Sequence, residues 1–328
     1  MHAWEVSLQI IFYDTIALDF GIMKPLLRIF LLTSCTFIMA CSLMSCETEI
    51  TQKYTPQYSA TSTLIEDDTF IFGIHPLHNP ERLHEFFGPI TDYLSNNIEG
   101  VSFKIEASRN YATFDEKLYS GKFHFALPNP YQTINSFEHG YKVFAKMADD
   151  ENFRGIIIVR KDSGVNEVTD LKGGSVSFPA PTALAATMLP QYFLQAHGLD
   201  VMQDIDIQYV GSQESSIMNV MLGNTIAGAT WPPPWRTLSK ERPQLAKEMK
   251  IIWRTPSLPN NSLVARKDID QQIVNKVKAL LLTLHEQPQG KAWLAKIGLS
   301  QFETAENETY DPVFEFIARF NKEVRVTD

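Results

Sequence analysis

Three histidines stand close together in the sequence: His75, His78 and His84. Imidazole is both a common metal ligand and a common acid–base group. A metal site needs further ligands at matching spacing, and neither a carboxylate pair nor a cysteine accompanies these three. The segment that follows residue 68 also lacks GxSxG, HExxH, Walker and dinucleotide fingerprints. The sequence therefore predicts no metal site, no cofactor and no catalysis, and His75, which ends a predicted strand, is instead expected to line a cleft.

Two tryptophans form the other conspicuous chemical feature, in the run Thr230-Trp231-Pro232-Pro233-Pro234-Trp235. The prolines restrict the backbone, so both indoles would lose little entropy on binding a ligand. Indole faces suit a planar ligand or a cation. The alternative is that Trp231 and Trp235 pack inside the protein, as most aromatic side chains do.

A cysteine ends the first hydrophobic stretch, in Leu43-Met44-Ser45-Cys46. A short basic segment beginning at Met23 precedes the apolar residues 29–44, which is the layout of a secretory signal and too short for a membrane-spanning helix of about 20 residues. The end of this stretch resembles a lipoprotein cleavage site, with Cys46 as the acylated residue and Cys41 as a second candidate. An ordinary signal peptide or an uncleaved anchor is the alternative, and either one also exports the rest of the chain.

All three cysteines lie in this leader, so we expect no disulfide in the mature protein. The predicted organisation is a leader and lipoprotein signal over 1–46, with a true start possible at Met23 because Glu5, Asp14 and Asp19 are unusual in a signal peptide. A polar tether follows over 47–68. The net charge of −9 gives no electrostatic footprint for nucleic acid.

The remainder alternates between strand and helix patterns. A β-branched and aromatic run covers 69–74, a helix with one apolar face starts after Asn79-Pro80, and residues 101–105 alternate as a half-buried strand does. A second strand–helix series begins after the apolar segment 153–159. The pattern predicts an α/β fold with two lobes, each a mainly parallel sheet flanked by helices. Lobe 1 is expected to comprise 69–158 and 255–328, and lobe 2 159–254, with a ligand cleft between them.

Segments in the same order and spacing resemble the phosphate, phosphite and phosphonate-binding periplasmic proteins of ABC transporters, which are type II solute-binding proteins. The resemblance covers about Phe70 to Asn321. The residues that carry it are Phe72-Gly73-Ile74, the Tyr111 helix, Phe125 to Tyr131, Gly155 to Val159, Val168 to Gly173, Phe178 to Thr182, Val210 to Ser215 and Ile251 to Pro256.

The resemblance implies a ligand site at a helix start, where free N–H groups and the helix dipole hold an oxyanion. The family has a proline and a run of serines and threonines there, and this chain has Pro179-Ala180-Pro181-Thr182-Ala183-Leu184. A histidine of the family is replaced by Gln213, and an acidic residue by Ala227. The expected ligand-binding residues are His75, Tyr111, Asn129, Tyr131, Pro179, Thr182, Ala183, Gln213, Glu214, Thr230 and Trp231.

Some of these residues have a structural alternative. Tyr111 and Tyr131 are equally suited to the surface of a lobe. Thr182 could be a plain helix cap. Gln213 and Glu214 could belong to a second helix cap that Ser212 or Ser215 closes.

The resemblance and the leader together predict a lipid-anchored protein on the periplasmic side of the bacterial envelope. It would bind a small ligand of the phosphonate or phosphate kind and present it to an ABC permease and ATPase. One alternative is a ligand-sensing lipoprotein that reports to a membrane signalling protein. Others are a binder of a planar or cationic ligand through Trp231 and Trp235, and an iron-binding relative that uses Tyr111, Tyr131 and His75.

Overall fold

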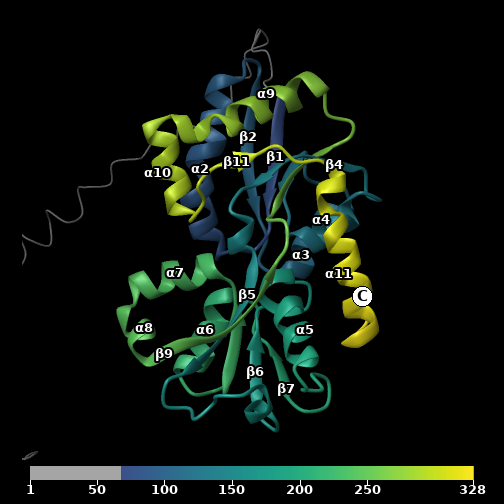
Figure 1. Ribbon diagram of the computed structural model, residues 1–328. Helices are drawn as coiled ribbons and strands as arrows, with labels where there is room; N and C mark the ends of the chain where they lie inside the picture. The colour runs from purple at the N-terminus through teal and green to yellow at the C-terminus, as the bar shows by residue number, and fades with distance from the viewer. Residues whose placement is uncertain (1–67, 328) are drawn as a thin grey trace, which may run out of the picture. The chain divides into compact units, whose positions relative to one another are not determined.

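The computed structural model describes residues 68–327, so the leader, the tether and all three cysteines lie outside the described residues. Within this range, strands and helices alternate along most of the chain (Figure 1). The strands are β1 (Asp68–Ile74), β2 (Val101–Ala107), β3 (Phe125–Leu127), β4 (Tyr141–Met147), β5 (Arg154–Arg160), β6 (Ser175–Phe178), β7 (Asp206–Tyr209), β8 (Ala227–Thr230), β9 (Met249–Ser257), β10 (Ser262–Arg266) and β11 (Phe302–Glu303).

Ten α-helices connect or cover these strands in the described range: α2 (Pro80–Asn97), α3 (Tyr111–Tyr119), α4 (Pro130–Ser136), α5 (Leu189–Ala196), α6 (Gln213–Met221), α7 (Pro232–Glu241), α8 (Pro243–Glu248), α9 (Gln271–Leu282), α10 (Pro288–Lys296) and α11 (Asp311–Glu323). Several begin where local chemistry favours it. Asn79 caps α2 by accepting from the Arg82 amide at 2.9 Å, and Pro80 occupies the first turn. A search of residues 68–327 finds no helix that is both long and apolar enough to span a bilayer.

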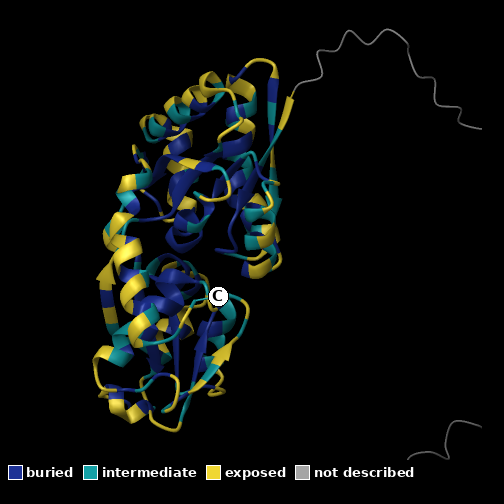
Figure 2. Cartoon of the chain, turned by 90° about the vertical axis from the view of Figure 1, so that its right-hand side faces the viewer, coloured by how far each residue is buried: buried dark blue, intermediate teal, exposed yellow. Residues whose placement is uncertain are grey.

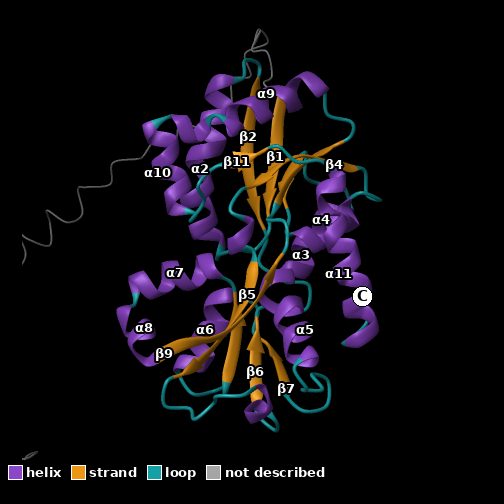
Figure 3. Ribbon diagram, viewed as in Figure 1, coloured by secondary structure: helices purple, strands orange, loops and turns teal. Residues whose placement is uncertain are grey.

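The strands form two separate sheets. Each sheet and the helices that flank it make up one lobe, and we call these lobe 1 and lobe 2. The sheet of lobe 1 has the order β11-β4-β10-β3-β1-β2, and that of lobe 2 the order β7-β6-β8-β5-β9. Figure 3 shows helices on both sides of each sheet. The predicted two-lobe α/β fold is therefore confirmed.

Both sheets are mixed rather than mainly parallel. β1 pairs in parallel with β2 and β3, whereas β10 and β4 run antiparallel to their neighbours. In lobe 2, β6 is parallel to β7 and β8, whereas β5 is antiparallel to β8 and β9. The chain changes lobe after β4 and returns after β9, and the first strand after each crossing, β5 or β10, runs opposite to the helix-linked strands of its sheet. The sequence placed the lobe boundaries between residues 158 and 159 and between residues 254 and 255. Because all of β5 and β9 belongs to the lobe 2 sheet, sheet membership favours boundaries within residues 148–153 and 258–261.

The two faces of the lobe 2 sheet are both buried, and β5 explains how. Ile157 and Val159 pack on one face with Phe178 and Leu194, while Ile156 and Ile158 pack on the other with residues of α6 and α7. Because side chains alternate along a strand, a strand buried on both faces reads as a continuous apolar run. Figure 2 shows the resulting buried interior beneath exposed helices.

Helix α11 contacts both lobes. It packs on α4 of lobe 1 and on α5 of lobe 2, where Phe316 meets Tyr192 edge to face with ring centroids 5.5 Å apart. Beyond the helix, Arg325 donates to the Pro181 carbonyl at 2.7 Å and to Gln191 Oε1 at 3.2 Å. The chain after the last crossing thus links the lobes a third time.

Candidate functional site

A small cavity lies between the lobes, where the carboxyl ends of β1 and β3 meet the start of the helix that leads into α5. Its lining residues are His75, Tyr111, Asn129, Phe153, Ala183, Leu184, Ala185, Ala186, Gln213, Trp231 and Asn261. The cavity has a volume of about 10 Å³, near the minimum that one water molecule requires. Side chains of both lobes line the site.

The helix at this cavity begins with a π-helical turn, Leu184–Met188, which continues into α5. The Ala183 amide donates to Ala180, and the Thr187 and Met188 amides both donate to Ala183. Within residues 68–327, the amides of Leu184, Ala185 and Ala186 donate to no hydrogen bond. First-turn amides and the helix dipole together favour an anion, and here they lie on the cavity wall.

Close packing against β5 holds this helix start. A Cβ built on Gly155 would lie 2.6 Å from Pro190 and 2.7 Å from the Ala185 carbonyl oxygen. Only glycine lets the helix backbone approach the strand this closely. Gly155 therefore fixes the depth at which the free amides sit in the cleft.

Gln213, the first residue of α6, joins side chains of both lobes. Its Nε2 donates to the Tyr111 hydroxyl at 3.4 Å, and its Oε1 accepts from the Thr230 hydroxyl at 2.8 Å. Burial raises the pKa of Tyr111 well above its usual value, so the phenol keeps its proton. The predicted cap is also present, because Ser212 accepts from the Ser215 amide at 3.0 Å. Gln213 is thus free of the capping role that was its alternative.

His75 contributes a neutral imidazole. Burial lowers its pKa to about 4, so the ring is uncharged at neutral pH. Its Nδ1 lies 2.9 Å from the Leu127 carbonyl, which can only accept, and Nδ1 therefore carries the proton. Neither lysine nor arginine is among the residues that line the cavity. An anion here would be held by dipoles and neutral donors.

Asn129 and Asp115 fasten the segment before the helix start to lobe 1. Asn129 caps α4 in a capping box with Gln132, and its Nδ2 donates to the Thr182 carbonyl at 3.0 Å. Asp115 on α3 accepts from Gln132 Nε2 at 2.5 Å and from the Thr182 hydroxyl at 3.4 Å. Burial raises the pKa of Asp115 to about 6. Asp115 carries no recognisable motif, and for that reason sequence reasoning missed it.

Asn261 was also missed, because Asn260-Asn261 reads as an ordinary loop. The side chain is fully buried on the cavity wall, and its Oδ1 has no hydrogen-bond partner within residues 68–327. Its Nδ2 contacts Met147 Sδ at 3.5 Å. A buried acceptor without a partner is costly, so this atom favours a ligand that brings a donor.

The expected binding residues fall into two groups. Six line the cavity: His75, Tyr111, Asn129, Ala183, Gln213 and Trp231. The other five do not. Thr182 and Thr230 support cavity residues through the bonds above, and Pro179 is buried, with its carbonyl accepting from the Gly211 amide at 2.8 Å. Tyr131 is buried in the apolar core of lobe 1, and Glu214 pairs with Arg242 at 3.0 Å.

The two tryptophans do not act together. Trp231 lines the cavity and meets Phe153 edge to face, with ring centroids 5.7 Å apart. Trp235 packs with Leu238 and Leu245 in the core of lobe 2. The structure therefore offers one indole to the cleft, and a paired indole site is not formed. No group of three histidine, cysteine or acidic side chains suited to a metal occurs between residues 68 and 327.

Comparison with known proteins identifies the architecture. The family model for the periplasmic substrate-binding protein of phosphonate ABC transporters matches residues 72–310. A probable phosphite-binding protein of an ABC transporter, PhnD1 of Prochlorococcus marinus (strain MIT 9301), is 24% identical over 204 residues, which cover 58% of this chain and 67% of the relative. The phosphonates-binding periplasmic protein of Escherichia coli (strain K12) is 21% identical over 250 residues, 74% of each chain.

Solved structures agree in fold. PhnD1 from Prochlorococcus marinus in complex with methylphosphonate superimposes with a TM-score of 0.72 at 20% identity, covering 78% of this chain and 99% of that one. A binding protein of an ABC phosphonate transporter from Pseudomonas aeruginosa gives the same TM-score at 18% identity, covering 78% of this chain and 88% of that chain.

Proposed function

Because the chain belongs to the family of periplasmic substrate-binding proteins of phosphonate ABC transporters, we propose that its cleft binds a phosphonate, phosphite or phosphate-like oxyanion. The observation that carries this proposal is the set of free amides at Leu184, Ala185 and Ala186 on the cavity wall. These amides belong to the backbone, so they persist although Thr182 alone keeps a hydroxyl of the family's serine and threonine run.

The other cavity residues complete a cage for such an anion. Tyr111 keeps its phenolic proton and can donate it in a hydrogen bond. Asn261 Oδ1 can accept from an oxyanion that retains a proton, which a phosphonate monoanion does and a sulfonate does not. Tyr111 is in lobe 1, Asn261 directly precedes the lobe 1 strand β10, and the amides are in lobe 2, so the ligand favours the closed arrangement by bridging the lobes.

The family is a class of transport proteins and not of enzymes, and it works in the periplasm with an ABC transporter. We propose further that this chain is held at a membrane by a lipid on Cys46, or alternatively on Cys41, both of which lie outside the described residues. Mass spectrometry of protein purified from membranes, from the wild type and from the Cys46→Ala and Cys41→Ala variants, tests this. A mature protein without lipid would refute it.

Thermal-shift titration tests the ligand class. Methylphosphonate, phosphite and phosphate form the first set, and ethanesulfonate, a quaternary amine and a planar heterocycle form the second. A ligand at about 100 times its Kd adds about 2.7 kcal/mol of stability. We expect shifts with the first set. Shifts confined to the amine or the heterocycle would assign the cleft to Trp231 and overturn the oxyanion proposal.

A further inference from the structure

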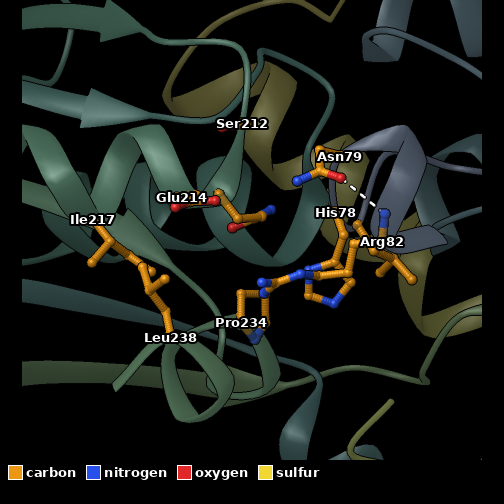
Figure 4. Close-up of a pocket in the computed structure, with 10 residues that line it drawn as sticks. His78, Asn79, Arg82, Ser212, Glu214, Ile217, Pro234 and Leu238 are labelled. Carbon is orange, nitrogen blue, oxygen red and sulfur yellow. Dashed lines mark hydrogen bonds between the residues drawn. The ribbon is translucent and has the colours of Figure 1, made fainter. Parts of the chain in front are cut away.

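A second cavity lies on the other side of Gln213, also between the lobes, with a volume of about 50 Å³. Lobe 1 contributes the loop before α2 and the first turn of that helix, including His78 and Arg82. Lobe 2 contributes the first turns of α6 together with α7. In Figure 4, Ile217 and Leu238 lie side by side on one wall, and His78 and Pro234 face the same space. The second cavity is thus larger than the first and is likewise lined by both lobes.

Gln213 is the partition between the two cavities, because its side chain lines both. It is held from one side by Tyr111 at 3.4 Å and from the other by Thr230 at 2.8 Å. An amide side chain has several rotamers, so a modest rearrangement of Gln213 joins the two spaces. A ligand whose anionic end sits at the amides of Leu184–Ala186 would reach the second cavity through this position.

The apolar part of the wall of the second cavity is formed by Leu77, Ile217, Pro234 and Leu238, and polar or charged side chains form the rest. Ile217 is fully buried, Leu77 and Leu238 are 5% and 3% exposed, and Pro234 is also buried. Such walls stabilise hydrocarbon in proportion to the area removed from water.

The charges around the second cavity balance. Arg82 pairs with Glu241 at 3.0 Å, and Glu214 pairs with Arg242 at 3.0 Å. Burial, with a smaller effect from Arg82, lowers the pKa of His78 to about 4, so its ring is neutral. The second cavity therefore offers no uncompensated charge to a ligand.

We propose, on the basis of the function proposed above, that the second cavity receives the organic substituent of a phosphonate whose oxyanion lies at Leu184–Ala186, and that this substituent is a short uncharged alkyl chain. The first cavity then recognises the head common to all phosphonates, while the second selects among them. A charged substituent is disfavoured, because it would lose its hydration while the charged side chains on the wall, Arg82 and Glu214, are already paired with Glu241 and Arg242.

Calorimetric titration of the full-length protein with methyl-, ethyl-, propyl- and butylphosphonate tests this, with 2-aminoethylphosphonate as the charged comparison. Each buried methylene should tighten binding about fourfold, and 2-aminoethylphosphonate should bind no better than ethylphosphonate. The variant Leu238→Phe narrows the cavity and should abolish the gain with chain length while leaving methylphosphonate unchanged. Leu245→Phe, the same change in the same core but away from the cavity, should keep the gain.

A melting temperature confirms that each variant folds, and Leu238→Ala serves as a second variant because it enlarges the cavity and should favour the longest chain. Equal affinity for all chain lengths in the wild type would overturn the proposal and leave the oxyanion function intact. Loss of methylphosphonate binding in Leu238→Phe but not in Leu245→Phe would overturn it as well. Binding of no oxyanion at any chain length would instead refute the function itself.

Discussion

Removing one backbone amide from the helix start provides the sharpest test of the oxyanion site. Proline at position 184 has no N–H, and the first turn of a helix accepts it well. The wild-type Leu184 amide makes no hydrogen bond within residues 68–327, so Leu184→Pro removes no structural bond. Ala183 has ψ 89°, outside the α region that a following proline disfavours. The matched control is Leu184→Ala, which loses the same buried side chain and keeps the amide.

The size of the effect follows from the charge of the ligand. A hydrogen bond to a charged group contributes about 1.5–3 kcal/mol, so Leu184→Pro should bind methylphosphonate roughly 10- to 150-fold more weakly than Leu184→Ala. Calorimetry measures both Kd values, and thermal denaturation confirms that both variants fold. The same Kd for two folded variants would refute the assignment of this amide to the anion.

Three further outcomes are expected. Gly155→Ala should destabilise the protein by about 1–3 kcal/mol in thermal melts, because the added Cβ overlaps Pro190 and the Ala185 carbonyl. The control is Gly88→Ala, whose added Cβ has no neighbouring atom within 4 Å and should be neutral or stabilising. For Asp115, the folded pKa of about 6 exceeds the unfolded value near 3.8, so its contribution to stability is present below pH 4 and is lost as the pH rises through 6. Urea denaturation from pH 4 to 7 should show that the difference in free energy of unfolding between the wild type and Asp115→Asn changes with pH. His75 and His78 titrate in both proteins, so their contributions cancel in this difference. A difference that stays constant with pH would contradict the burial of Asp115. Arg325 does not line the cavity, but Arg325→Ala should weaken ligand binding severalfold because it removes the hydrogen bond to the Pro181 carbonyl. Arg319→Ala, on the exposed side of α11, should leave ligand binding unchanged. Equal Kd values for the two variants would exclude a role for the Arg325 contact.

Much of the fold was predictable because periodicity and caps are local. The α2 cap at Asn79 and the doubly buried β5 appear directly in the sequence. β4 was missed, since Lys142 and Lys146 interrupt its apolar pattern. Lys146 is buried nonetheless, and it pairs with Asp150 at 2.6 Å and with Glu303, a residue that only the folded chain brings near it. The prolines after Trp231 were expected to hold both indoles for a ligand, but they form the first turn of α7, and Trp235 packs in the core of lobe 2.

The site was predictable where a residue ends a strand or begins a helix, as His75, Tyr111 and Gln213 do. Asp115 and Asn261 stand neither at a predicted strand end nor at a predicted helix start, so the sequence did not single them out. Asp115 matters only because Gln132 and Thr182 reach it from other elements. Asn261 matters because its oxygen is buried without a partner within residues 68–327, which is a property of packing.

The contact of α11 with both lobes has a consequence for the concentration range in which the protein responds. Apparent affinity equals intrinsic affinity scaled by the fraction of molecules already in the binding arrangement. The Phe316–Tyr192 and Arg325–Pro181 contacts join the two lobes outside the cavity, so we expect their loss to change that fraction. Substitutions along this helix are therefore expected to shift the ligand concentration at which the protein responds, while the residues that line the cavity stay the same.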